Sequence, residues 1–109
     1  MIDVINVTRE LYEGSQRLEK SGSELFRLAK ESAEAERDYR VALAREKLKL
    51  RAEGMPIGLI EDVSRGNIAD ERFKRDLAKE KYIAGRDSIK AIIAQLNALQ
   101  SILRNQREI

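Results

Sequence analysis

The sequence predicts an all-α protein: a long antiparallel helical hairpin with an extra N-terminal helix and a short helical connector, assembled into an oligomeric bundle. Ala, Glu, Lys, Leu and Arg make up about half of the 109 residues, a composition typical of long helices and coiled coils. Proline occurs once, at Pro56, and glycine is sparse. Near the C-terminus, residues spaced alternately by three and four mark one helix face: Tyr82, Gly85, Ile89, Ile92, Leu96, Leu99 and Leu103.

The first expected helix covers residues 3–20, and Asp3 can cap it. Gly14 weakens this helix in the middle. Ser21 and Glu24 have the spacing of a capping box, so a break or bend is expected near residues 20–23, with a kink in one continuous helix as the alternative.

A second helix is expected over residues 23–53. Gly54 is well placed for a left-handed C-terminal cap, and Pro56 prevents the helix from resuming at once. The connector, residues 54–66, carries too many apolar side chains for a solvated loop, so a short, buried helical turn is expected there. Asn67 can cap a last helix over residues 68–107. These elements form a single domain, residues 1–109.

The C-terminal seam must be covered by other helices of the chain or by a second copy. Because a single hairpin leaves other apolar faces open, we expect a homo-oligomer.

Composition excludes several kinds of chemistry. The chain has no cysteine and no histidine, which removes disulfides, cysteine nucleophiles, histidine bases and the usual zinc ligands. Carboxylate pairs such as Glu34 with Asp38 are better explained as solvated ion pairs than as a metal site. The expectation is a protein without catalysis, metal or cofactor. No signal peptide and no apolar stretch of about 20 residues is visible, so an intracellular protein without a membrane span is expected.

Two arrangements of basic residues could bind an anionic ligand. Tyr39 lies between Arg37 and Arg40, which suits stacking on a base beside a phosphate, although core packing of Tyr39 is the favoured interpretation. The turn of residues 64–67 leads into an expected helix N-terminus, where free amides favour an anion, although an ordinary capped helix start is the favoured interpretation. The candidate ligand-binding residues are Arg37, Tyr39, Arg40, Arg65, Gly66, Arg72, Lys74 and Arg75.

Several segments resemble one group of proteins. They are Ala33–Ala44 (AEAERDYRVALA), Leu50–Pro56 (LRAEGMP) with Leu59-Ile60 and Arg65-Gly66, and Glu71–Ala78 (ERFKRDLA). Together they resemble small helical proteins encoded by phages and prophages of Gram-positive bacteria. The resemblance covers residues 30–103, roughly, and the connector is its most specific part. The resemblance implies that the protein is encoded by a phage and acts in the cytoplasm of the bacterial host. It indicates less about the activity of the protein.

The first functional hypothesis is a non-enzymatic counter-defence protein, an oligomeric sponge that sequesters a host immune signal such as a cyclic nucleotide or dinucleotide. The second is an accessory protein of phage DNA replication or recombination that binds DNA or a replication protein. A structural scaffold of the virion is the third. The small net charge of +2 and the interspersed acids and bases argue against binding nucleic acid by charge alone.

Overall fold

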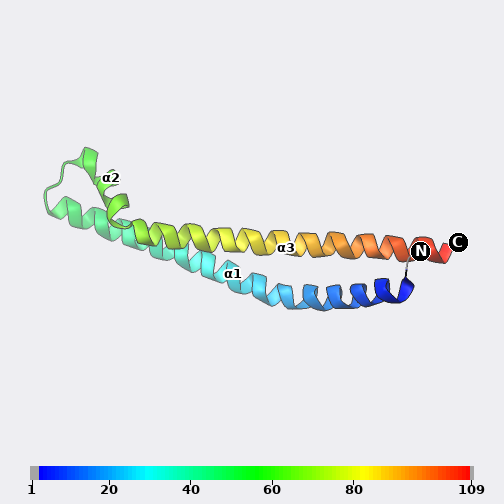
Figure 1. Ribbon diagram of the computed structural model, residues 1–109. Coiled ribbons are helices and arrows are strands. Elements are labelled where there is room, and N and C mark those ends of the chain that lie inside the picture. The colour runs from blue at the N-terminus through cyan, green and yellow to red at the C-terminus, as the bar shows by residue number, and fades with distance from the viewer. Residues whose placement is uncertain (1–2, 109) are drawn as a thin grey trace. The chain divides into compact units, whose positions relative to one another are not determined.

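Over residues 3–108, which the computed structural model describes, the chain folds into three helices and no strand (Figure 1). They are α1 (Val4–Ala52), α2 (Ile57–Asn67) and α3 (Ala69–Glu108). The predicted all-α class is confirmed. Contacts divide the chain into two compact units: unit 1 is Met1–Arg27 with Ile83–Ile109, and unit 2 is Leu28–Tyr82. In both units a part of α1 pairs with a part of α3.

Helix α1 begins at the predicted cap. The Asp3 carboxylate accepts hydrogen bonds from the amides of Ile5 and Asn6, at 3.0 and 3.4 Å. The expected break near residues 20–23, and with it the separate N-terminal helix, is wrong because α1 runs unbroken to Ala52. Instead of capping a new helix, the Ser21 hydroxyl donates to the Arg17 carbonyl within the same helix, at 2.7 Å.

A heptad pattern explains why α1 stays continuous. In unit 1 the less exposed positions of α1 are Val7, Leu11, Gly14, Leu18, Ser21 and Leu25, spaced alternately by four and three. The region of the expected break therefore lies inside a repeating face that packs on another helix. Burial along this face outweighs the local cost of Gly22, about 1 kcal/mol.

The seam of α3 lies in unit 1, except for Tyr82, which belongs to unit 2. Leu96 and Leu99 are buried, and the other predicted seam residues are partly buried. A Cβ atom placed on Gly14 would lie 2.6 Å from Cδ2 of Leu96. Gly14 is thus a point of close approach between α1 and α3, where the sequence indicated only a weak point in a helix. The same chain covers the seam at this position.

In unit 2, a Schellman motif ends α1 where the sequence predicted. Gly54 has a φ of 84°, the left-handed region. The Met55 amide donates to the Leu50 carbonyl and the Gly54 amide donates to the Arg51 carbonyl, both at 3.1 Å.

The connector is ordered as α2, as predicted, but the expectation that its apolar residues are buried is partly wrong. Ile57 and Leu59 are exposed, at 83% and 54%, while Ile60 and Val63 are partly buried. Ser64 is fully buried and donates to the Glu61 carbonyl at 2.9 Å. One face of α2 packs on the rest of unit 2, and the opposite face is exposed to solvent.

The contact at Gly14 predicts unequal effects of two glycine substitutions. Gly14→Val should lower the free energy of unfolding by about 1–3 kcal/mol, because the new side chain must displace Leu96. In the matched control, Gly22→Val, nothing lies within 4 Å of the added Cβ, so the change should stay within about 0.5 kcal/mol. Urea unfolding followed by circular dichroism measures both. Equal effects would contradict the close approach.

Candidate functional site

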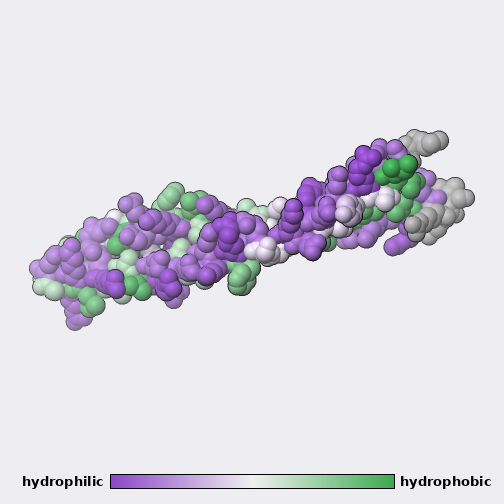
Figure 2. Space-filling view, turned by 90° about the horizontal axis from the view of Figure 1, so that it is seen from below, coloured by the Kyte–Doolittle hydropathy of each residue, from purple (hydrophilic) through white to green (hydrophobic). Residues whose placement is uncertain are grey.

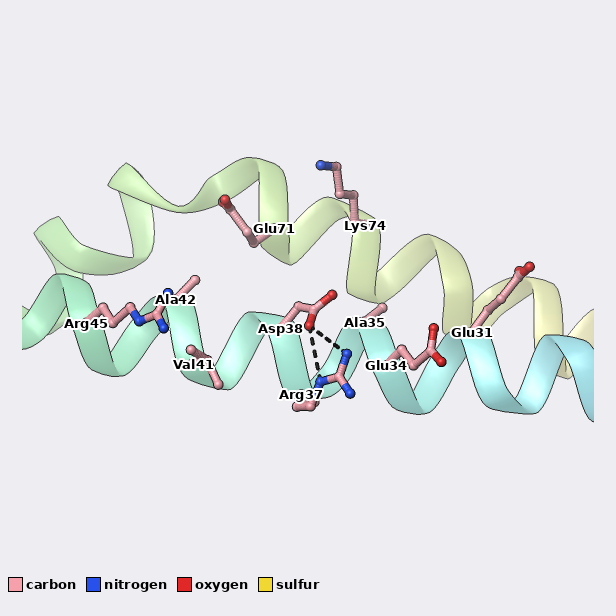
Figure 3. A pocket seen from close by; sticks show the side chains of 10 residues that line it. All are labelled: Glu31, Glu34, Ala35, Arg37, Asp38, Val41, Ala42, Arg45, Glu71 and Lys74. Atoms are coloured by element: carbon pink, nitrogen blue, oxygen red, sulfur yellow. Dashed lines mark hydrogen bonds and ion pairs between the residues drawn. The ribbon is translucent and has the colours of Figure 1, made fainter.

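Unit 2 carries an open groove of about 690 Å³ along α1 and α3 (Figure 3). Its middle holds the small side chains of Ala35 and Ala42, with Val41 beside them. Charged residues surround this apolar strip, four acids and three bases: Glu31, Glu34, Asp38, Glu71, Arg37, Arg45 and Lys74. The lining is therefore nearly balanced in charge.

Close to the groove, Arg75 of α3 lies on Tyr39 of α1. The guanidinium carbon is 4.1 Å from the ring centroid. Arg75 also contacts Asp76 at 2.9 Å and Glu36 at 3.7 Å, and the hydrogen bond that its guanidinium donates to Asp76 raises the pKa of Arg75. Tyr39 is only 8% exposed. The favoured interpretation, core packing of Tyr39, is confirmed, and Arg75 already covers one face of the ring.

Most of the other candidate arginines are paired with carboxylates. Arg37 binds Asp38 at 3.2 Å, Arg40 binds Glu36 at 2.9 Å, and Arg65 binds Glu61 at 2.8 Å. Glu36 therefore accepts from Arg40 and also lies near Arg75. These pairs are largely exposed, and each contributes about 0–1 kcal/mol to the free energy of unfolding.

Arg72 and Lys74 differ from these arginines. Both are exposed on α3, and neither forms an ion pair with another residue in the described part of the chain. Lys74 borders the groove, and in Figure 3 its side chain extends away from α1. Of the eight candidates, these two are the cations that an anion could approach without displacing a carboxylate.

The expectation of a turn at residues 64–67, with an anion site as its less favoured interpretation, is wrong. These residues are helical and form the last turn of α2, where the helix presents carbonyl groups. Arg65 lies in that last turn, at the negative end of the helix dipole, and Gly66 is exposed beside it. Asn67 is the last residue of α2 and Ile68 separates it from α3, so it is not the predicted cap; its side-chain amide donates to Glu46 of α1 at 2.8 Å.

Two features of unit 2 were not predicted from the sequence: Glu36 lies between two arginines, and Arg45 is exposed in the groove. Both depend on the register between α1 and α3. A heptad alignment of the two helices against each other could have found them. Among the described residues, no group of three or more acidic side chains is placed to hold a metal ion. None of the three helices has a described stretch long and apolar enough to span a membrane.

No protein-family model, curated protein or solved structure matches the chain.

The contact between Arg75 and Tyr39 predicts a difference between two arginines one turn apart. Arg75→Met should lower the free energy of unfolding by about 1–2 kcal/mol, because it removes the cation over the ring and leaves Glu36 and Asp76 without that partner. The control, Arg72→Met, should change it by less than about 0.5 kcal/mol. Thermal unfolding followed by circular dichroism provides the comparison. Equal losses would mean that the ring contact adds nothing.

Proposed function

We propose that this chain acts by binding, without catalysis, as an assembly of helical hairpins. One observation carries the proposal: the chain leaves much apolar surface in water. Six apolar residues form the buried core of the described chain, against eleven large apolar residues that are exposed. On the face in Figure 2, apolar side chains lie at the surface among hydrophilic ones. Association of copies would cover such surface.

The proposed ligand of the assembly is a phosphate-bearing nucleotide, which makes the protein a phage sponge for a host immune signal. Support comes from the unpaired cations Arg72 and Lys74 and from the arginine-rich composition. Within one chain the nearby carboxylates offset most of the positive charge. Two copies side by side would double the number of cations that a ligand with several phosphates can reach, so capture depends on assembly.

Calorimetry with a panel of cyclic dinucleotides and cyclic oligonucleotides tests this proposal. Saturable binding of at least one of them is expected, with the ligand recovered chemically unchanged. The double variant Arg72→Ala with Lys74→Ala should weaken binding about tenfold or more, because it removes two charged contacts. Lys90→Ala, which removes an exposed lysine of α3 in unit 1, is the control and should bind like the unmodified protein.

The same experiment separates the proposal from the alternative function. Binding of DNA with a steep salt dependence, together with no heat from any nucleotide, would reject the sponge and favour a role in replication or recombination. Conversion of a nucleotide to a product would reject the claim that the protein only binds.

A further inference from the structure

A second face of α1, within unit 2, is exposed along its whole length. Its residues follow heptad spacing, four then three, as the packed face does, but on another side of the helix. They are Glu34, Asp38, Val41, Arg45 and Leu48, and all five are exposed. Val41 and Leu48 are 42% and 67% exposed although both are large apolar side chains. Heptad spacing with apolar members is the pattern by which one helix packs on another.

The groove beside this face is shaped for a helix. Glu34, Asp38, Val41 and Arg45 line it together with Ala35 and Ala42 (Figure 3). Alanines let a neighbouring helix approach closely and leave room for a large side chain of that helix. Charged side chains border this apolar strip, as in helix interfaces whose flanking charges select the partner.

Charge divides this part of α1 into two blocks around Val41. Residues 31–38 hold four carboxylates and one arginine, a net charge of −3. Residues 45–51 hold four basic residues and one glutamate, a net charge of +3. Parallel packing of two identical helices would place like charges together. Antiparallel packing would place each acidic block against a basic one.

We infer that the occupant of this groove is a second copy of the chain, with α1 packed antiparallel on α1 of the partner around a two-fold axis between Val41 and Ala42. That axis places Asp38 opposite Arg45 of the second copy, and Glu34 opposite Lys49. It also places Leu48 opposite Ala35, a large exposed side chain against a small one. The face is therefore complementary to itself, as a two-fold interface requires.

The inference rests on the assembly that the proposed function requires, but it does not depend on the nucleotide.

Light scattering of the full chain in the absence of nucleotide tests the interface with complementary charge reversals. The acid-reversed variant carries Glu34→Lys and Asp38→Lys, and the base-reversed variant carries Arg45→Glu and Lys49→Glu. Each variant alone brings like charges together, so it should be monomeric at a concentration where the unmodified chain is dimeric. An equimolar mixture of the two should form a dimer containing one copy of each.

Restoration by mixing cannot arise from variants that fail to fold, and unchanged helicity by circular dichroism checks each variant separately. The control variant, Lys79→Glu with Lys81→Glu, reverses two exposed charges of α3 outside the groove and should remain a dimer. An unmodified chain that remains monomeric at about 100 μM would overturn the inference. So would reversed variants that stay dimeric, or a mixture that stays monomeric. A dimer that binds no nucleotide would reject the proposed function and keep the interface.

Discussion

The pairing of α1 with α3 in one antiparallel register is the constraint on which the other features depend. Gly14 meets Leu96 in unit 1, and Glu36 meets Arg75 in unit 2. Shifting either helix by one residue would turn its face by about 100° and move these groups apart. The same register covers the face of Tyr39 with Arg75.

This pairing buries little apolar surface because many positions on the packed face are small or polar. In unit 2 the inward face of α1 includes Ser32, Ala35, Ala42 and Glu46. Each of these residues stabilises the fold by less than the roughly 1.5–3 kcal/mol that a fully buried large apolar side chain provides. Small residues nevertheless let the helices approach closely, and they leave a groove that a further helix could fill. The small and polar residues that reduce the buried core of one chain thus favour association between copies.

Local signals in the sequence predicted the fold well. Asp3 and Gly54 act through neighbouring backbone groups, so the start and end of α1 could be read from a few residues. The break at residues 20–23 was predicted wrongly because local capping signals compete there with packing on α3, which short segments do not reveal. The candidate site was harder to predict. The contact between Tyr39 and Arg75 joins residues far apart in sequence, and the pairing of most candidate arginines with carboxylates depends on side-chain placement.

A disulfide test of the register addresses the central claim most directly, since the described residues contain no cysteine to interfere. A Cβ on Gly14 would lie 3.5 Å from Cγ of Leu96, near where the sulfur of a cysteine at position 96 would lie, so cysteines at these two positions are within reach of a disulfide. The double variant Gly14→Cys with Leu96→Cys should therefore oxidise rapidly to an intrachain disulfide, seen as a faster-migrating monomer on a non-reducing gel. Gly22→Cys with Leu96→Cys, displaced by about 12 Å along α1, should not. Equal oxidation of both pairs, or disulfides only between chains, would contradict the register.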